Sequence, residues 1–332
     1  MIRPLAALAL ALALAPAAWA QGSYAKRPDV RAFIREQVER NGFVESELAT
    51  LFSRARRSEP VLQAIEPQPP AARAWEEYRA TFVNERRIAG GLAFWRAHRK
   101  ALVRAQREFG VPAETIVAII GVETFYGRNT GRWRVVDALT TLAFDYPPRA
   151  DFFRAELENY LMLARDAGID VFSVRGSYAG AIGIPQFMPS SVRRYALDFD
   201  GNGAIDLQRS ATDAIGSVAN FLKQHGWQPG AGVAFRARVS GEAYRAYADG
   251  SVEPRHLVSD LARAQVVAPE MPELPAAERA ALVALETPER PSEYRIGLNN
   301  FYVLTRYNRS ALYAAAVADL AKELRARQEA GR

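Results

Sequence analysis

The chain contains no cysteine, which excludes disulfide bonds, thiol nucleophiles and zinc–thiolate centres. We also expect no lipid anchor, since no cysteine is available to carry one. Histidine is scarce: His98, His225 and His256 stand far apart, without the spacing of metal ligands. The stability of the fold must therefore come from packing or from ions held by oxygen ligands.

No run of five like charges occurs, although the formal net charge is +6 and arginine supplies most of the positive charge. A basic surface favours anionic partners such as nucleic acid, acidic lipid or cell-wall polymer. The chain has no nucleic-acid-binding motif, so we expect no nucleic-acid partner and interpret the arginines chiefly as solvated helix faces. It also lacks a GxxxxGK[ST] loop and a GxSxG elbow, which argues against nucleotide-dependent and serine-nucleophile enzymes.

Residues 1–20 have the features of a cleavable signal peptide. They contain Arg3, an apolar stretch from Leu5 to Ala15, and the small-x-small sequence Ala18-Trp19-Ala20. The apolar stretch is shorter than the ~20 residues that span a bilayer, which disfavours an uncleaved anchor. We expect the mature chain to begin near Gln21, to be exported and soluble, and to have no membrane span.

Hydrophobic periodicity predicts an α+β fold that is mainly α. Helical patterns extend from Asp29 to about Leu62, with a turn at Asn41-Gly42, and from Trp75 to Phe109, on either side of the proline-rich residues 66–70. A further helical pattern covers 152–164. Alternating or short apolar stretches at 233–239, 281–285 and 293–296 predict strands in a β-rich segment, 229–297. A last helix is predicted through Ala326, with Ser310 as its N-cap.

Glu123 lies in the sequence GVETFYG, residues 121–127, at the end of an apolar run. Pro112 fits the first turn of a helix, and the last glycine of the sequence fits its end. Glu123 then shares the inward face of Ile116 and Ile119. A carboxylate held among apolar side chains has a raised pKa and stays protonated nearer neutral pH, as a general acid requires. The alternative for this residue alone is a buried glutamate that is only hydrogen-bonded.

A glycine-rich segment, SYAGAIGIPQFMPSS at 177–191, has the composition of a ligand-binding loop. Its glycines let the backbone pass close to a ligand. Gln186 offers an amide donor and acceptor, and Phe187 and Met188 offer an apolar platform for a sugar face. The alternative is a helix-start loop with Ser190 as its cap.

The sequence DFDGNGAID, residues 198–206, has the spacing of a calcium loop. Oxygen ligands fall at positions 1, 3 and 5, glycine at position 6 and an apolar residue at position 8. Position 12, usually glutamate, is Arg209, and the next carboxylate, Asp213, stands at position 16, so an EF-hand here is an elongated variant. We expect a structural Ca²⁺ and no catalytic cofactor. The predicted ligands are Asp198, Asp200, Asn202, Ala204 and Asp213.

The sequence NNFYVLTRYN at 299–308, together with Tyr313, places tyrosine beside asparagine. An aromatic face suits the C–H groups of a sugar, and an amide suits its hydroxyl or acetamido groups. The same residues would also be ordinary in a protein core.

Four sequences, GVETFYG, SYAGAIGIPQFMPSS, DAIGSVANFLKQHGW and NNFYVLTRYN, together resemble the membrane-bound lytic murein transglycosylase B family, glycoside hydrolase family 103. The family cleaves peptidoglycan between N-acetylmuramic acid and N-acetylglucosamine. The resemblance covers essentially the whole mature chain and implies a lysozyme-like core with an N-terminal α domain and a small β domain. The implied division is 21–105 for the α domain, 106–228 for the core with its EF-hand-like loop, 229–298 for the β domain, and 299–332 for a return to the core.

The resemblance also implies which residues act. Glu123 matches the single catalytic glutamate, and the calcium-loop residues match as well. The residues that match the sugar cleft are Tyr78, Ser177, Gln186, Tyr307, Asn308 and Tyr313. The chain departs from the family pattern at two points. Phe221 stands where a cleft tyrosine is found, so a hydroxyl contact is lost or replaced. The lipid-attachment cysteine is missing, which implies a soluble, periplasmic member.

No second acid accompanies Glu123 in its motif, whereas ordinary glycosidases use two carboxylates. We interpret Asp137, Asp145 and Asp151 as cap or turn residues. The resemblance implies that Glu123 acts first as acid and then as base, giving 1,6-anhydro-muramic ends. A lysozyme-type peptidoglycan hydrolase and a non-catalytic peptidoglycan-binding protein are the alternatives. Glycan strands are the expected partner, with other cell-wall enzymes as potential partners, and we expect a monomer.

Overall fold

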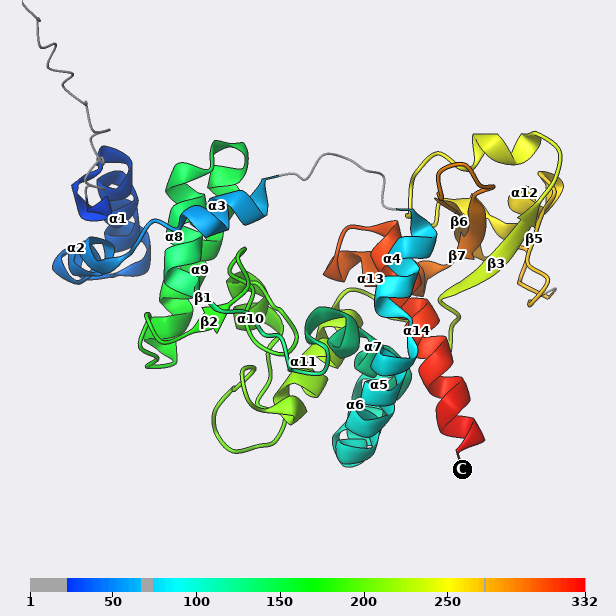
Figure 1. Cartoon of the computed structure of the whole chain (residues 1–332), viewed down its shortest axis with the longest axis horizontal. Coiled ribbons are helices and arrows are strands. Elements are labelled where there is room, and N and C mark those ends of the chain that lie inside the picture. Colours follow the sequence, from blue (N-terminus) through cyan, green and yellow to red (C-terminus); the bar gives the residue numbers. More distant parts are fainter. Residues whose placement is uncertain (1–22, 67–73, 272, 332) are drawn as a thin grey trace, which may run out of the picture. The chain divides into compact units, whose positions relative to one another are not determined.

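The computed structural model describes residues 23–66, 74–271 and 273–331, so the predicted signal peptide lies outside the described residues. The chain divides into two compact units, Met1–Arg57 and Ser58–Arg332 (Figure 1). In the described ranges, no helix is both long and apolar enough to cross a membrane.

The first unit consists of a short 3-10 helix, η1 (Tyr24–Lys26), and two helices, α1 (Pro28–Asn41) and α2 (Glu45–Arg54). Proline begins α1, and Gly42 ends it with a φ of 68°, a left-handed conformation that glycine adopts without strain. The predicted turn at this point is thus confirmed. Phe33 and Phe52 pack edge to face between the two helices, with ring centres 6.0 Å apart.

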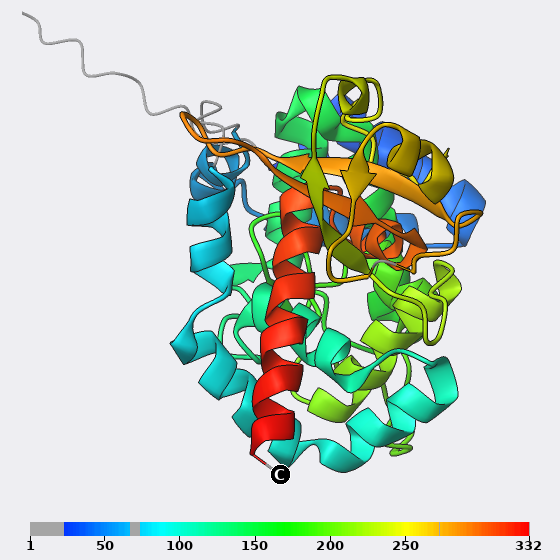
Figure 2. The same ribbon diagram turned by 90° about the vertical axis from the view of Figure 1, so that its right-hand side faces the viewer.

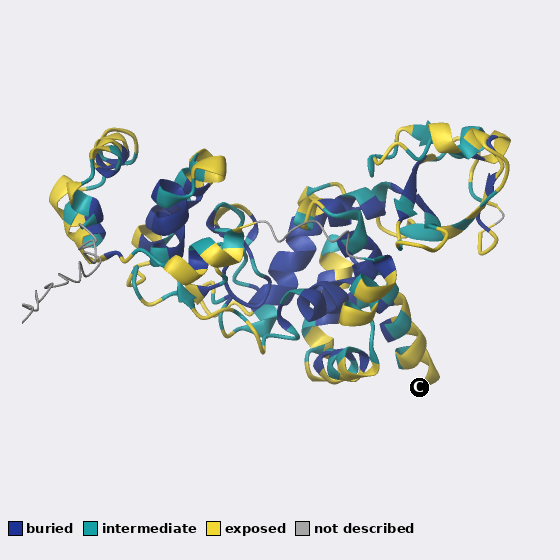
Figure 3. Cartoon of the chain, turned by 45° about the horizontal axis from the view of Figure 1, so that its top comes forward, coloured by how far each residue is buried: buried dark blue, intermediate teal, exposed yellow. Residues whose placement is uncertain are grey.

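The second unit is mainly helical, and buried residues occupy the inner faces of its helices (Figure 3). The predicted helical pattern over 75–109 is three helices, because Asn84 caps a new helix by accepting from the Arg87 N–H and the helix axis breaks again at His98. The helices are α3 (Glu59–Ile65), α4 (Trp75–Phe82), α5 (Glu85–Ala97), α6 (Arg99–Phe109), α7 (Ala113–Thr124), α8 (Val135–Asp145), α9 (Ala150–Asp166), α10 (Pro189–Tyr195), α11 (Ala211–Gln224), α12 (Val258–Arg263), α13 (Asn299–Tyr307) and α14 (Ala311–Ala330).

Helix α7 is deeply buried, with nearly every residue inaccessible to solvent. It packs against α14, α5 and α11. Pro112 stands at its N-cap, one residue before the expected first turn. The helix ends at Thr124 rather than at the predicted Gly127, because Phe125 and Tyr126 already adopt left-handed backbone, with φ of 51° and 64°. Such backbone is strained for residues other than glycine, and it lies directly beside Glu123.

A small antiparallel sheet follows α11. Its strands are β3 (Ala234–Val239), β4 (His256–Leu257), β5 (Val266–Val267), β6 (Arg279–Leu285) and β7 (Glu293–Gly297), in the order β4-β6-β7-β3-β5. The three predicted strands correspond to β3, β6 and β7 and are confirmed. A second pair, β1 (Trp133–Arg134) with β2 (Arg175–Gly176), joins two loops of the helical part. The 3-10 helices η2 (Pro147–Arg149) and η3 (Ala243–Ala246) complete the fold, so the α+β prediction is confirmed.

The last helix connects the sheet to the helical part. Ser310 caps α14 by accepting from the Tyr313 N–H, as predicted. The helix packs along α7 and reaches α4 and β6, and Figure 2 shows its first turns beside the sheet. Segments from the start, the middle and the end of the second unit are thus held together through α14.

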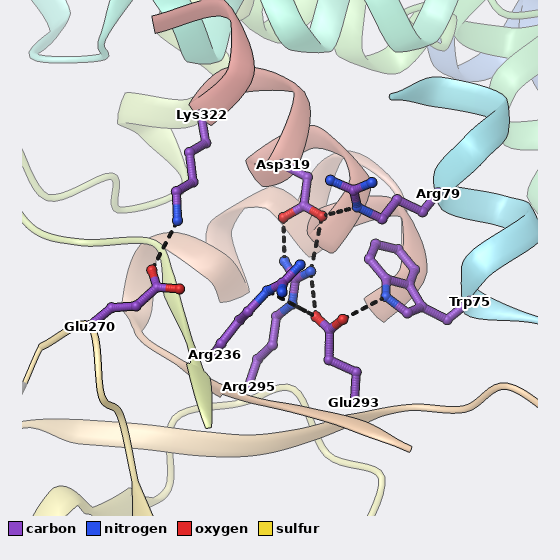
Figure 4. A network of polar contacts seen from close by, with 8 residues as sticks. All are labelled: Trp75, Arg79, Arg236, Glu270, Glu293, Arg295, Asp319 and Lys322. Carbon is purple, nitrogen blue, oxygen red and sulfur yellow. Dashed lines mark hydrogen bonds and ion pairs between the residues drawn. The ribbon is translucent and has the colours of Figure 1, made fainter. Parts of the chain in front are cut away.

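A buried ion network joins α4, β7 and α14 (Figure 4). Arg295 is 3% exposed and donates to both oxygens of Asp319, at 2.7 and 3.0 Å, and to Glu293 at 2.8 Å. Arg79 donates to Asp319 at 2.6 Å, and the indole N–H of Trp75 donates to Glu293 at 3.2 Å. Burial alone would raise the pKa of Asp319, but Arg295 and then Arg79 outweigh burial and lower it.

We predict that Asp319→Asn lowers the free energy of unfolding by about 3 kcal/mol, because it leaves the buried Arg295 without its bidentate partner. Urea unfolding measures the change. Glu270→Gln is the matched control, because it removes the ion-pair partner of Lys322, which lies on α14 as Asp319 does. Both side chains of this pair are exposed, so the loss in free energy of unfolding should stay below about 1 kcal/mol.

The pH dependence gives the second readout of this prediction. The folded-state pKa of Asp319 lies below its unfolded value, so its contribution is present above about pH 4 and is lost as the pH falls further. The difference between wild type and Asp319→Asn should therefore shrink below about pH 4. Equal, small effects of both substitutions at neutral pH would contradict the proposed weight of the network.

Candidate active site

Glu123 occupies the last turn of α7 and meets the first turn of α14. The Tyr313 hydroxyl donates to Glu123 Oε1 at 2.6 Å. Tyr313 itself is 2% exposed, and its position is set by the Ser310 cap three residues before it. A helix end and a helix start that lie far apart in the sequence therefore present one carboxyl group in a fixed orientation.

The electrostatics of this pair suit an acid. Burial raises the pKa of Glu123 to about 7, although the hydrogen bond from Tyr313 acts in the opposite direction. Burial, with the Glu123 charge next, holds the pKa of Tyr313 well above its usual value. The phenol thus remains a neutral donor, and near neutral pH the carboxyl group is present in both its protonated and ionised forms.

An aromatic wall stands beside the pair. Tyr307, at the end of α13, lies nearly parallel to Tyr313, with ring centres 6.4 Å apart, and its hydroxyl donates to the Pro185 carbonyl at 2.6 Å. Behind it lie Phe221, 4.8 Å away, and Phe187, 5.8 Å away. These contacts fix the ring of Tyr307 from three directions.

Burial corrects one expectation for this wall. Phe187 is 2% exposed, so it cannot offer its face to a sugar, and the predicted platform reduces to the partly exposed Met188. Phe221 is 5% exposed and packs against Tyr195 and His225 as well as Tyr307. Both phenylalanines support the wall from within, which a sequence pattern alone does not reveal.

The glycine-rich segment lies against the end of α7. The Thr124 hydroxyl donates to the Ile184 carbonyl at 2.9 Å and accepts from the Gly127 N–H at 2.9 Å. The Gln186 side-chain nitrogen donates to the carbonyls of Thr130 and Gly183, at 3.1 and 2.8 Å. The amide donors of Gln186 are therefore engaged, and its carbonyl oxygen is the group available to a ligand.

Ser177 has the complementary arrangement. Its Oγ accepts from the N–H groups of Ala179 and Ala181, at 3.2 and 3.0 Å, so the hydroxyl hydrogen can be donated to a ligand. The segment is not simply a helix start capped by Ser190. Helix α10 begins at Pro189, and Ser190 donates through its N–H and hydroxyl to the buried Glu156, which acts as the anion at that helix start.

Two further predicted residues lie at the edges of this arrangement. Tyr78 on α4 packs 5.0 Å from Phe82, and it is one of the groups that, after burial, raise the pKa of Tyr313. Asn308 follows α13 and is exposed. Thr124 and Glu156 were not predicted; a polar residue next to Glu123 and a glutamate among apolar helix positions are the only sequence signals for them.

No second carboxylate acts on Glu123 within the described ranges. Its pKa responds only to burial and Tyr313. Asp137 pairs with Arg134 at 2.6 Å, and the fully exposed Asp151 lies 3.6 Å from Arg154. Neither is the cap or turn residue that we expected: Asp137 lies in the first turn of α8 and Asp151 in the first turn of α9, each beside a local arginine.

The predicted calcium loop brings three carboxylates together. One oxygen each of Asp198, Asp200 and Asp213 lies within 4.8 Å of the others. Asp198 accepts the N–H groups of residues 201–203, and these backbone hydrogen bonds, that of Gly203 above all, lower its pKa despite desolvation. The buried Asp213 accepts from the N–H groups of residues 199, 200 and 206. An all-oxygen set of this kind fits a hard divalent cation.

Comparisons with known proteins agree with this geometry. The family model described as the transglycosylase SLT domain matches residues 25–322. The chain is 41% identical to membrane-bound lytic murein transglycosylase B of Escherichia coli strain K12 over 309 residues, 90% of this chain and 83% of the relative. Among solved structures, soluble lytic transglycosylase SltB1 from Pseudomonas aeruginosa matches with 47% identity and a TM-score of 0.85, over 91% of this chain and all of that chain.

Two other solved structures contain ligands. The Escherichia coli lytic transglycosylase Slt35 in complex with calcium matches with 40% identity and a TM-score of 0.82, over 93% of this chain and 96% of that chain. SltB3 from Pseudomonas aeruginosa, in complex with NAG-anhNAM-pentapeptide, matches with 29% identity and a TM-score of 0.79, over 89% of this chain and 78% of that chain. This chain belongs to the transglycosylase SLT domain family, and it is a lytic transglycosylase of the type that these relatives represent.

Proposed function

We propose that the enzyme cleaves the β-1,4 bond between N-acetylmuramic acid and N-acetylglucosamine in peptidoglycan without water, using Glu123 as its only catalytic carboxyl group. The observation that carries this proposal is the Glu123–Tyr313 pair, with a carboxyl pKa of about 7 and no second carboxylate acting on it in the described residues. A single group that is protonated in part at neutral pH can serve in turn as acid and as base.

The reaction then has two steps. In the first, protonated Glu123 gives its proton to the glycosidic oxygen, the bond from C1 to that oxygen breaks, and the oxygen of the 2-acetamido group bonds to C1. In the second, the Glu123 carboxylate removes the proton of the C6 hydroxyl of the same sugar. The C6 oxygen bonds to C1, the acetamido oxygen leaves, and the product is a 1,6-anhydro sugar with Glu123 protonated again.

The neighbouring side chains have distinct roles in this proposal. Ser177 donates its hydroxyl hydrogen, and Gln186 accepts through its carbonyl oxygen, which together orient the acetamido and hydroxyl groups. Tyr307 and Met188 contact the sugar, while Asn308 and Tyr78 bind at the edges. Phe187 and Phe221 hold Tyr307 in place. Tyr313 orients the carboxyl group and limits the rise of its pKa.

Lysozyme-type hydrolysis on the same site is the competing reaction. It would use the same first step, and water rather than the C6 hydroxyl would then attack C1, leaving reducing ends. The relative complexed with NAG-anhNAM-pentapeptide holds an anhydro sugar, which supports the intramolecular route for this chain.

The setting of the enzyme is part of the proposal. Residues 1–20 direct export, and the mature enzyme acts as a periplasmic monomer with the domain division that the family resemblance implies. A structural Ca²⁺ is held by the carboxylates of Asp198, Asp200 and Asp213, with Asn202 and the carbonyl of Ala204. The calcium complex of a relative supports a calcium ion in this chain. The ion would fix the loop before α11 and takes no part in the chemistry.

We predict that Glu123→Gln lowers kcat at least 100-fold, the order expected for loss of a general acid and base. The amide still accepts from Tyr313, so the melting temperature should not fall. Mass spectrometry of the soluble products of purified peptidoglycan gives the readout, with Glu47→Gln on the exposed surface of α2 as control. Anhydro ends from wild type that vanish in the variant are expected. Reducing ends would instead identify a hydrolase.

We also predict that kcat/KM falls as the pH rises through about 7, because the acid form of Glu123 is lost there. Tyr313→Phe removes the hydrogen bond that lowers this pKa, so the fall should move to higher pH while the maximal rate decreases. A pH–rate profile of both proteins tests this. A fall of kcat/KM centred near pH 4.5 in the wild type, or one that moves to lower pH in Tyr313→Phe, would contradict the role of Glu123 as the acid.

For the calcium loop, we predict that Ca²⁺ raises the melting temperature and that a chelator reverses the effect. At a calcium concentration 100 times Kd, binding raises the free energy of unfolding by about 2.7 kcal/mol. Asp200→Asn removes one of the three clustered carboxylates and should abolish the calcium dependence. Mg²⁺, which prefers a smaller octahedral site, serves as the control ion. A melting temperature that ignores both Ca²⁺ and chelator would refute the site.

A further inference from the structure

The end of α7 is held by one residue of the neighbouring helix α5. The guanidinium of Arg87 donates to the carbonyl of Gly121. The backbone carbonyl of Arg87 accepts from the Tyr126 hydroxyl at 2.8 Å. We refer to these two hydrogen bonds as the Arg87 clasp. Its two contact points on the chain lie on either side of Glu123, so the clasp encloses the turn that carries the proposed catalytic carboxyl group.

The ring of Tyr126 occupies a slot lined by three glycines, Gly90 and Gly91 of α5 and Gly121 of α7. A Cβ on Gly91 or on Gly121 would lie 2.6 Å from the Tyr126 hydroxyl. A Cβ on Gly90 would lie 3.0 Å from Cε2 of the same ring. Glycine weakens a helix interior, and here it makes room for the tyrosine in both helices.

The backbone that follows Glu123 is strained. Phe125 and Tyr126 have φ of 51° and 64°, and Gly127 continues the left-handed conformation with 84°. In residues with a side chain, this conformation costs free energy and persists only where surrounding contacts hold it. The contacts of Tyr126 with α5 are of that kind. Without them the chain could relax toward right-handed backbone, and the change would begin two residues after the carboxyl group.

The position of this turn matters because the Glu123 carboxyl group is oriented from another helix. Its Oε1 accepts from the Tyr313 hydroxyl of α14 at 2.6 Å. Hydrogen bonds between two oxygens span a range of only about 0.5 Å in length. The clasp fixes the turn to α5, and the bond from Tyr313 fixes its carboxyl group to α14, while both of these helices pack on α7. Movement of the turn away from α5 would therefore disturb the bond to α14.

We propose that Tyr126 is a positioning residue for the reaction: its hydroxyl bond to α5 and its place among the three glycines hold the last turn of α7, so that Glu123 stays within reach of Tyr313. This inference rests on the catalytic role proposed for Glu123 and adds the residue that holds it in place. Tyr126 acts through the backbone of α7, not on the sugar.

The test compares Tyr126→Phe with Tyr160→Phe on purified peptidoglycan. Tyr160 is the matched control, because its hydroxyl also donates to a backbone carbonyl, that of Val171 at 2.7 Å, but joins α9 to the loop after it. Each substitution removes one hydroxyl group and keeps the ring, so both melting temperatures should fall by similar amounts. Rates are measured where both variants are folded.

The expected difference between the two variants lies in kcat. A misplacement of about 1 Å can cost about 100-fold in rate, and the loss of one hydrogen bond permits a smaller shift, so kcat of Tyr126→Phe should fall about 10-fold. Its KM should change little, since the contacts with the sugar remain. Tyr160→Phe should keep the kcat and KM of the wild type.

The pH–rate profile separates positioning from stability. The pKa of Glu123 responds to burial and to the hydrogen bond from Tyr313, and its charge acts in turn on Tyr313 and Tyr307. If Tyr126→Phe loosens that bond, the fall of kcat/KM should move to higher pH, as in Tyr313→Phe but by less. A variant that only contains less folded enzyme leaves the fall at its wild-type pH. In the double variant Tyr126→Phe/Tyr313→Phe the fall should lie where it does in Tyr313→Phe alone.

Several outcomes would overturn the inference. Equal kcat in Tyr126→Phe and Tyr160→Phe would reduce Tyr126 to a packing residue. A lower kcat with an unmoved pH profile would mean that it does not act through the bond from Tyr313, and a raised KM with unchanged kcat would place it in substrate binding. Retained activity in Glu123→Gln would overturn the proposed function itself. An inactive Glu123→Gln beside a fully active Tyr126→Phe would overturn only this inference.

Discussion

The hydrogen bond from Tyr313 to Glu123 links the packing of α14 on α7 to the chemistry of the carboxyl group. Its two residues are 190 positions apart in the sequence, so it forms only when α14 lies along α7. Another face of α7 also needs a small residue: a Cβ on Gly121 would lie 2.6 Å from the Tyr126 hydroxyl, which donates to the Arg87 carbonyl of α5. The same packing partly desolvates the Glu123 carboxyl group, and this desolvation raises its pKa. The packing of α14 on α7 therefore both orients the Glu123 carboxyl group and raises its pKa.

Two other sets of contacts keep this arrangement fixed. The Asp319–Arg295 pair holds α14 to the sheet and to α4, and because its charges are buried, it resists sliding of the helix along its neighbours. Thr124 also holds the glycine-rich segment to the end of α7, and Gln186 holds it to the loop that follows. The Ser177 hydroxyl hydrogen and the Gln186 carbonyl oxygen of that segment thereby remain available to a ligand.

Features that neighbouring residues determine were predicted correctly from the sequence, whereas features that depend on tertiary contacts were not. The Ser310 cap, the turn at Gly42 and the strand at 234–239 follow from neighbouring residues and were predicted correctly. The end of α7 was misplaced because two aromatic residues adopt backbone that usually belongs to glycine. The face of Phe187 could not be assigned, since composition does not show which side of a loop is buried. The ion network around Arg295 could not be predicted from the sequence, because its members come from segments far apart in the chain.

The late position of Tyr313 and Asp319 has a consequence for the time at which the enzyme becomes active. Both residues lie in the last twenty positions of the sequence, and both complete contacts with segments made much earlier. A chain still emerging during synthesis or transport therefore lacks the helix that finishes the carboxyl site. Any chain in which α14 has not yet packed on α7 lacks the hydrogen bond to Glu123 and the carboxylate partner of Arg295, so assembly of the acid site is the same event as docking of this helix.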